Sequence, residues 1–318
     1  MKMKRVLSML LALILMASIL VGCGKQEEPA IVDDSQTAVD TPVVEQPADE
    51  QEEKLDPELV LLEHTIAYFD NIPSNSNMIK PADALDLIEN NPDALFVVDM
   101  RGQEDYEKGH LPGAVNIPLG QMGKNLDRLP SNKQIILYCY SGQTTGLAVS
   151  ALKLLGFNAI SFQGGMNFGW KPLELSEDTL ETEVNPLPEP KTPNLTEEEQ
   201  ILWDAVVAFF DEGKGNIEGA EKAHETIEAN PGAVYILDIR GNEDFEKGHI
   251  EGSENIPFKE LGKNIDKLPK NRPIYVTCYS GQTAAQTQSL LRINGYNAFS
   301  IGRGMAGWNG AELPVATN

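Results

Sequence analysis

The sequence predicts two tandem α/β domains, each with an open, mainly parallel β-sheet that carries helices on both faces. The chain repeats itself: residues 94–144 match residues 233–283 without a gap. A period this long indicates tandem domains, since solenoid repeats are roughly 20–50 residues long. Within each repeat, short apolar runs alternate with helical patterns, which is typical of an open α/β sheet. The length of 318 residues also suits two domains of roughly 100–200 residues each.

The elements expected in the first repeat follow from local signals. Proline or glycine closes each of three expected helices, at Pro92, Pro130 and Gly156. The continuous apolar run over residues 95–100 is typical of a parallel strand that is buried on both faces. A short helix is expected around Trp170. The expected helical segments are 82–90, 104–108, 121–129 and 144–155, and the expected strands are 95–100, 113–118, 135–138 and 159–162.

An amphipathic helix is expected before each repeat, over residues 57–69 and 197–210. The second places Trp203, Val206 and Phe210 on one face. We expect each helix to cover its own domain. The alternative is that the two helices pack between the domains.

The first residues have the pattern of a targeting segment. Residues 1–5 are basic, residues 6–20 are apolar, and Leu-Val-Gly-Cys follows at 20–23. The four residues at 20–23 resemble the lipobox of bacterial lipoproteins. This resemblance implies that residues 1–22 are a signal peptide, cleaved before a diacylglyceryl-modified Cys23. The protein would then be anchored by lipid to the cell membrane, facing outside the cytoplasm. An uncleaved anchor is the alternative, but the apolar run is short for a span of about 20 residues.

Two polar segments divide the mature chain. Residues 23–55 are acidic and lack apolar periodicity, so we expect a disordered tether. Residues 176–195 are rich in Pro and Glu, and we expect a semi-rigid linker. The domains are therefore expected at 56–175 and 196–318.

Charge and motifs narrow the possible partners. The formal net charge is −23, which argues against nucleic acid or an anionic lipid surface as a partner. The sequence shows no metal-ligand cluster and no nucleotide-binding loop, so no metal and no cofactor are expected.

Two equivalent cysteines are the candidate reactive residues. Residues 139–144 and 278–283 share the sequence Cys-Tyr-Ser-Gly-Gln-Thr, and each copy joins an apolar strand to a helical pattern. Free N–H groups and the helix dipole favour negative charge at such a position, so a thiolate is stabilised there. We expect Cys139 and Cys278 to be reactive thiols in exposed loops; the alternative is a pair of buried, inert thiols. The remaining loop positions, which would bind an anion, are Tyr140, Ser141, Gly142, Gln143, Thr144 and Thr145, and Tyr279, Ser280, Gly281, Gln282, Thr283 and Ala284.

Two other cysteine enzymes are excluded by spacing. A cysteine phosphatase needs an arginine six positions after the nucleophile to grip phosphate, where this chain has Thr145 and Ala284. A thioredoxin-like enzyme needs a second cysteine at the positions of Gly142 and Gly281.

Each repeat resembles a rhodanese domain. The first repeat carries Asp-Met-Arg at 99–101, Gly-His-Leu-Pro-Gly-Ala at 109–114, Asn-Ile-Pro at 116–118, the cysteine loop and Gly-Gly at 164–165. The second repeat carries the counterparts of most of these motifs, with the cysteine retained. Neither loop contains the Arg or Lys that some thiosulfate-using members have there.

The resemblance implies sulfur transfer. The thiolate of Cys139 or Cys278 would take a sulfane sulfur from thiosulfate or polysulfide and pass it to cyanide or a thiol acceptor. Roles are also implied for the neighbouring side chains, with the histidines of the Gly-His-Leu/Ile segments as scaffold. Thr144 and Thr283 would donate hydroxyls to the anion, Tyr140 and Tyr279 would line the pocket, and the pairs Asp99 with Arg101 and Asp238 with Arg240 would support the loop. The alternative is a carrier, sensing or docking module without turnover.

Overall fold

The computed structural model describes residues 54–317, which fall within one compact unit. The expected signal peptide, Cys23 and nearly all of the expected tether lie outside the described residues. Among residues 54–317, no helix has both the length and the apolar character needed to cross a membrane.

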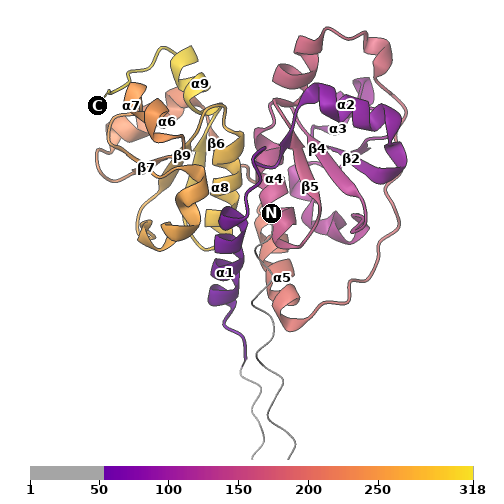
Figure 1. Ribbon diagram of the computed structural model, residues 1–318, viewed down its shortest axis with the longest axis horizontal. Coiled ribbons are helices and arrows are strands. Elements are labelled where there is room, and N and C mark those ends of the chain that lie inside the picture. Colours follow the sequence, from indigo (N-terminus) through magenta and orange to yellow (C-terminus); the bar gives the residue numbers. More distant parts are fainter. Residues whose placement is uncertain (1–53, 318) are drawn as a thin grey trace, which may run out of the picture. The chain divides into compact units, whose positions relative to one another are not determined.

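Each repeat forms a five-stranded sheet in which every pair of neighbouring strands is parallel (Figure 1). The strand order is β1-β5-β4-β2-β3 in the first repeat and β6-β10-β9-β7-β8 in the second. The strands of the first sheet are β1 Met78–Ile79, β2 Leu95–Asp99, β3 Val115–Asn116, β4 Gln134–Tyr138 and β5 Ala159–Phe162. Those of the second are β6 Ile217–Glu218, β7 Tyr235–Asp238, β8 Ser253–Asn255, β9 Ile274–Thr277 and β10 Ala298–Ile301. The predicted fold class is confirmed.

Helices cover both faces of each sheet, because successive side chains of a strand point to opposite faces. In β4, Ile135 and Leu137 join one hydrophobic cluster, whereas Ile136 and Tyr138 join the other. The helices of the first repeat after the N-terminal one are α2 Pro81–Asn90, α3 Gln103–Lys108 and α4 Gln143–Leu154. Those of the second are α6 Ala220–Ala229, α7 Asn242–Lys247, α8 Gln282–Ile293 and α9 Gly304–Gly310.

Two expected helical segments have a different form. Where an α-helix was expected over residues 121–129, the chain forms two 3₁₀ segments, Leu119–Gln121 and Gly123–Arg128. The segment around Trp170 is a π-helical turn, Gly165–Trp170. Both segments are helical turns, as expected, but the local sequence pattern does not distinguish a 3₁₀ or π turn from an α-helix.

The two repeats share one hydrophobic core through α4 and α8. The core cluster on this side contains buried residues of both repeats, such as Leu147 and Leu290. Where the helices cross, Ser150 Oγ lies 2.5 Å from Ser289 Oγ, and these residues occupy equivalent positions in the two repeats. The close approach depends on Gly146, where a Cβ would clash with the Gln282 carbonyl oxygen. Equivalent residues therefore face each other, as in a symmetric dimer interface.

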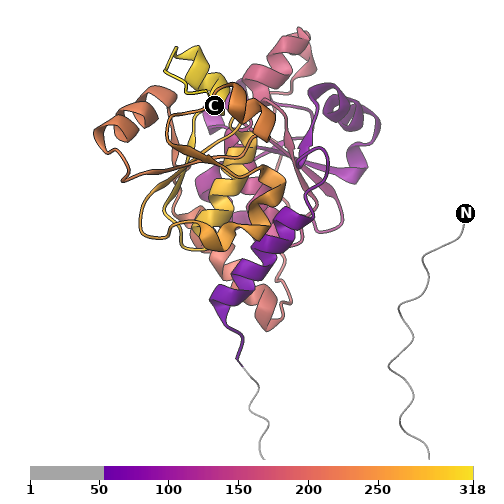
Figure 2. The same cartoon turned by 60° about the vertical axis from the view of Figure 1, so that its left-hand side comes forward.

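The N-terminal helices α1 (Pro57–Asp70) and α5 (Glu197–Asp211) each pack chiefly against the other repeat (Figures 1 and 2). The helix α1 contacts the 3₁₀ segment Phe258–Lys263. There the Phe69 and Phe258 rings pack edge to face, with their centroids 5.8 Å apart. In turn, α5 contacts Gly123–Arg128 of the first repeat. The expectation that each helix covers its own domain is therefore wrong. Amphipathicity shows that a helix face is buried but does not say against which neighbour.

Truncating Phe69 is expected to destabilise the second repeat as well as the first. Phe69 is fully buried, and removal of a buried phenylalanine ring costs about 3–5 kcal/mol. Urea denaturation of Phe69→Ala measures the loss. Hydrogen exchange then locates it: faster exchange in residues 258–268 is expected, and unchanged exchange there would contradict the exchanged packing.

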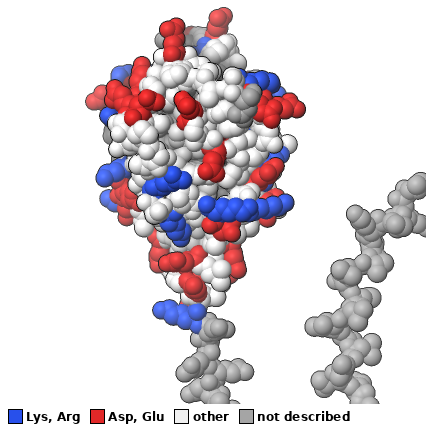
Figure 3. Space-filling view, turned by 90° about the vertical axis from the view of Figure 1, so that its left-hand side faces the viewer, with Lys and Arg blue, Asp and Glu red and all other residues white. Residues whose placement is uncertain are grey.

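The segment 176–195 follows the surface of the first repeat. The Asn185 N–H donates to Tyr106 Oη at 3.0 Å, Arg128 donates to the Pro188 carbonyl at 2.7 Å, and the Lys191 N–H donates to the Asp127 carbonyl at 2.8 Å. These contacts fix the path of the proline-rich linker from the end of the first repeat to α5. On the molecular face drawn in Figure 3, acidic and basic side chains are interspersed.

Candidate active site

Cys139 lies between the end of β4 and the start of α4, and Cys278 lies between β9 and α8. These are the carboxyl ends of central strands, where open α/β sheets bind ligands. Gly142 and Gly281 precede the helices with φ of 82° and 93°. This left-handed conformation favours glycine, and it turns the chain so that loop N–H groups point back at sulfur.

Both thiols are buried. Cys139 is 1% exposed and Cys278 is 2% exposed, so the expectation of cysteines in exposed loops is wrong with respect to exposure. Each sulfur belongs to the hydrophobic core cluster but also has backbone N–H donors beside it. The Gly142 N–H donates to Cys139 Sγ at 3.2 Å, and the N–H groups of Gly281 and Ala284 donate to Cys278 Sγ at 3.1 and 3.4 Å. Backbone donors of this kind favour an anionic sulfur. We therefore keep the prediction that both thiols are reactive.

A glycine lies behind each cysteine loop, Gly165 of the Gly-Gly pair in the first repeat and Gly304 after Arg303 in the second. The Met166 N–H donates to the Cys139 carbonyl at 2.8 Å, and the Met305 N–H donates to the Cys278 carbonyl at 2.8 Å. A Cβ on Gly165 or Gly304 would clash with the same carbonyl oxygens. The glycine motif noted in the sequence therefore allows the loop to be held by backbone bonds at close range.

The hydroxyl of Thr145 lies beside Cys139. Thr145 Oγ1 lies 4.0 Å from Cys139 Sγ, donates to the Gly142 carbonyl at 2.7 Å and lies 2.7 Å from Ser161 Oγ. Among residues 54–317, no hydrogen bond joins Thr144 or Thr283 to a cysteine sulfur, so the structure does not bring these expected donors to the thiol. The second repeat has Ala284 at the position of Thr145. The two cysteines therefore have different neighbours despite the matching loop sequences.

Tyr140 and Tyr279 lie at the outer side of the loops. They are 41% and 52% exposed, and their hydroxyls donate to Asp105 at 2.6 Å and to Asp244 at 2.7 Å. The hydrogen bond to Asp105, followed by burial, raises the pKa of Tyr140. Burial, followed by the hydrogen bond to Asp244, raises the pKa of Tyr279. Both phenols are therefore protonated at neutral pH, and their expected role in lining a pocket stays a prediction.

Removing the Tyr140 hydroxyl is expected to raise the pKa of Asp105. Hydrogen bonds from Tyr140 and Lys108 hold the pKa of Asp105 below its ordinary value. The lowered value means that the contact contributes stability above the ordinary carboxyl pKa and loses it as the pH falls through the lowered one. NMR titration of Tyr140→Phe measures the shift. The matched variant Tyr279→Phe is expected to raise the pKa of Asp244 instead, and an unchanged Asp105 in Tyr140→Phe would contradict the prediction.

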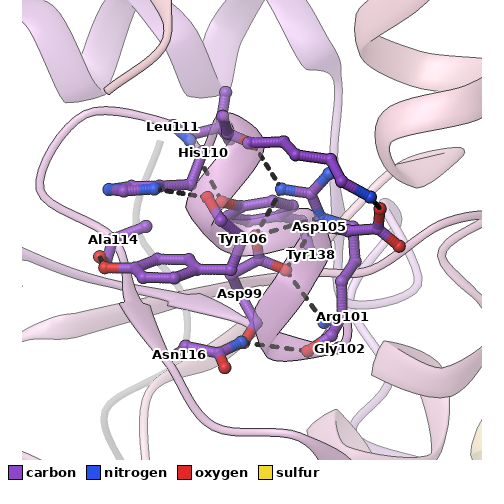
Figure 4. A network of polar contacts seen from close by, with 12 residues as sticks. Asp99, Arg101, Gly102, Asp105, Tyr106, His110, Leu111, Ala114, Asn116 and Tyr138 are labelled. Atoms are coloured by element: carbon purple, nitrogen blue, oxygen red, sulfur yellow. Dashed lines mark hydrogen bonds and ion pairs between the residues drawn. The ribbon is translucent and has the colours of Figure 1, made fainter. Parts of the chain in front are cut away.

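Asp99 and Arg101 form the ion pair expected from the sequence (Figure 4). Arg101 Nη2 lies 2.6 Å from Asp99 Oδ2 and donates to the Gly109 carbonyl at 2.6 Å. Burial opposes the charge on Arg101, but the hydrogen bonds and charge of Asp99 outweigh it and raise the pKa of Arg101. Asn116 donates to the carbonyls of Asp99 and Arg101, which ties the end of β2 to β3. The Arg101 guanidinium therefore has a structural role, in which it joins the end of β2 to the Gly109 carbonyl.

The second repeat contains the same pair and a matching scaffold histidine. Arg240 Nη2 lies 2.7 Å from Asp238 Oδ2 and donates to the Gly248 carbonyl at 2.7 Å. His110 and His249 are both buried and stack on Tyr106 and on the Phe245 ring, with centroids 3.8 and 4.0 Å apart. This placement agrees with the scaffold role expected for both histidines.

Two glutamines that were expected to bind an anion in the cysteine loops, Gln143 and Gln282, instead reach across to the other repeat. Gln143 and Gln282 are each 2% exposed. Gln143 Nε2 donates to Ser300 Oγ at 3.0 Å, and Gln282 Nε2 donates to Ser161 Oγ at 3.0 Å. A signal was present, because a serine recurs at the same place in both otherwise apolar last strands. A buried serine in such a strand needs a partner, but nothing in one repeat indicates that the partner lies in the other.

Among residues 54–317, no group of three or more His, Cys, Asp or Glu is placed to hold a metal ion.

Residues 80–171 and 219–311 match the family described as "Rhodanese-like domain". Three relatives are similar to parts of the chain. YrkF of Bacillus subtilis, whose name describes a candidate sulfur carrier protein, is 38% identical over 68 residues, or 21% of this chain and 37% of the relative. The tRNA sulfurtransferase of Pyrobaculum aerophilum is 35% identical over 80 residues, or 25% of this chain and 16% of the relative. Thiosulfate sulfurtransferase GlpE of Shewanella oneidensis is 31% identical over 81 residues, or 25% of this chain and 80% of the relative.

The chain thus spans well under half the length of the first two relatives. The match to the family covers both repeats and includes both cysteine loops. Together these similarities support sulfur transfer as the general class of chemistry.

Proposed function

Since the chain belongs to the rhodanese-like domain family, which matches more than half of its length in two copies, we propose that it is a sulfurtransferase with two cysteine sites. The donor is thiosulfate or polysulfide, and the acceptor is a thiol or cyanide. Each cysteine carries the sulfur as a persulfide between the two half-reactions.

One observation carries this proposal. Each buried Sγ accepts a hydrogen bond from the backbone N–H of the glycine that precedes the next helix, at 3.2 Å for Cys139 and 3.1 Å for Cys278. Groups fixed in advance around a developing anion stabilise it without reorganisation. They serve the attacking thiolate and, after sulfur has been taken up, the persulfide anion. A general base is not required for a thiolate held in this way.

In the first half-reaction, the thiolate Sγ attacks the outer, sulfane sulfur of the donor. An Sγ–S bond forms, the donor S–S bond breaks, and its electron pair leaves with the remainder, which is sulfite when the donor is thiosulfate. In the second half-reaction, cyanide or an acceptor thiolate attacks the outer sulfur of the persulfide. The Sγ–S bond breaks and the cysteine thiolate returns, so no external oxidant or reductant is consumed. Covalent catalysis in two steps predicts ping-pong kinetics.

A steady-state assay tests enzyme against carrier. The purified protein is given donor and excess cyanide, and thiocyanate is measured over many turnovers. Sustained production that is proportional to protein supports a sulfurtransferase. A single stoichiometric release followed by no further product supports a sulfur carrier. The presence of a cysteine at both sites favours reactivity over a purely structural role, and rapid turnover with ping-pong kinetics is the expected result.

We also propose that the protein is anchored to the cell membrane through lipid on Cys23 and faces outside the cytoplasm. The support is the basic, apolar and Leu-Val-Gly-Cys pattern of residues 1–23. Metabolic labelling with a fatty acid is expected to label the protein, and Cys23→Ser is expected to lose the label. Equal labelling of the two proteins would overturn the proposal.

A further inference from the structure

We propose that Gln282 of the second repeat is a positioning residue for Cys139 of the first, acting through a chain of hydroxyls that Cys278 lacks. The inference deepens the proposed function, since it bears on sulfur transfer only if the Cys139 thiolate is the nucleophile. It also implies that the two sites differ in thiol reactivity although their loop sequences match.

The chain of contacts crosses from one repeat to the other without a gap. Gln282 Nε2 donates to Ser161 Oγ at 3.0 Å, Ser161 Oγ lies 2.7 Å from Thr145 Oγ1, and Thr145 Oγ1 lies 4.0 Å from Cys139 Sγ. All four side chains are buried, with at most 2% of each exposed. Water therefore does not compete for these groups along the way.

The direction of donation follows from the partners. The Gly142 carbonyl only accepts, so the Thr145 hydroxyl donates its proton there, at 2.7 Å, while the cysteine is a thiol. The Ser161 hydroxyl then donates to Thr145, because the single proton of Thr145 is engaged with the Gly142 carbonyl. Ser161 itself accepts a hydrogen bond from the Gln282 amide. When the thiol loses its proton, Thr145 can turn its proton from the Gly142 carbonyl toward sulfur, and Ser161 still donates to Thr145 from behind. Aligned hydrogen bonds in a buried chain strengthen one another.

Gln282 also sets the shape of the loop that holds Cys139. Its Oε1 accepts the Gly164 N–H at 2.9 Å, next to the glycine that backs the cysteine carbonyl. A Cβ on Gly142, the residue whose N–H reaches Cys139 Sγ, would clash with the Gln282 side-chain amide. The Gln282 amide therefore lies directly against the cysteine loop of the other repeat.

In the second site, the corresponding chain from Gln143 ends at Ser300 and does not reach a hydroxyl beside Cys278. Gln143 Nε2 donates to Ser300 Oγ at 3.0 Å, and its Oε1 accepts the Arg303 N–H at 3.0 Å. The residue that would continue the chain to Cys278 is Ala284, which has no hydroxyl. Gln143 thus braces the second loop but has no polar path to its sulfur. This difference supplies an internal control for the experiment.

The test measures alkylation by iodoacetamide, which needs a thiolate but no sulfur transfer. The purified full chain is treated over a range of pH, and the modification of Cys139 and Cys278 is followed separately by peptide mass spectrometry. In Gln282→Met, a substitution of similar volume, the alkylation profile of Cys139 is expected to move to higher pH. Its rate below the midpoint is expected to fall about three- to tenfold, equivalent to roughly half to one unit of pH. The profile of Cys278 is expected to stay unchanged.

A double-variant cycle separates this role from a general loss of structure. Thr145→Val breaks the chain of hydroxyls next to the sulfur, so adding Gln282→Met to it is expected to have little further effect on the alkylation of Cys139.

Gln286→Met serves as the matched control. Gln286 is a buried glutamine of the same helix, but its amide bonds Tyr68 Oη and the Ser76 carbonyl. It is expected to lower stability without moving the Cys139 profile.

Two results would overturn the proposal. One is an unchanged Cys139 profile in Gln282→Met, and the other is an equal shift of both cysteines in that variant. A protein that alkylates as expected but never accepts sulfur would leave the positioning role intact and remove the proposed function. The two failures are therefore distinguishable.

Discussion

Replacing both Cys139 and Cys278 with serine is expected to reduce thiocyanate production to the rate seen without protein. A serine hydroxyl is not ionised at neutral pH and forms no persulfide, so neither half-reaction can proceed through it. Each single variant is expected to lose sulfur loading at its own site and to keep it at the other. Steady-state thiocyanate formation, with persulfide mapped by peptide mass spectrometry, measures both effects.

The two single variants are matched controls for each other, because the sites occupy equivalent positions in the fold. Loss of loading at both sites in one single variant would mean that sulfur enters through one cysteine only. Retained turnover in the double variant would contradict a cysteine mechanism altogether.

Replacing Arg101 with methionine is expected to lower the free energy of unfolding by about 3–5 kcal/mol. The Asp99 carboxylate is fully buried, and Arg101 is its partner in the ion pair. Removal of the guanidinium leaves a buried charge without compensation, which costs more than the pair itself contributes. Urea denaturation measures the change.

Adding Asp99→Asn to Arg101→Met is expected to recover part of the loss, because the unpaired charge is then gone. Arg240→Met gives the matched test in the second repeat, where Asp238 is also fully buried. A loss below about 1 kcal/mol, the size found for exposed ion pairs, would contradict the scaffold role of these arginines.

Much of the fold could be predicted from the sequence because its signals are local. The apolar run before Cys139 and the helical spacing after it correctly place the cysteine between a strand and a helix. The repeated loop also predicts two candidate sites, one in each repeat. The forms of residues 119–128 and 165–170 could not be predicted, because apolar spacing identifies a helical turn but not its pitch.

The features that were missed all depend on contacts between distant parts of the chain. The amphipathic face of α1 predicts burial, but its partner Phe258 lies in the other repeat. The polar Gln282 in the cysteine loop looks like a group that faces a ligand, whereas it is buried against Ser161. The burial of both thiols has the same origin, since each loop is covered by backbone from a later segment. Repeat comparison finds equivalent residues but does not show that they exchange partners.

The most direct test of the account is intact-protein mass spectrometry of the purified chain after incubation with thiosulfate and, separately, with polysulfide. The account predicts a gain of one sulfur per intact cysteine of the two loops with at least one donor, and loss of that gain when cyanide is added. The doubly substituted Cys139→Ser, Cys278→Ser protein sets the background. No gain of sulfur with either donor would contradict the sulfurtransferase function.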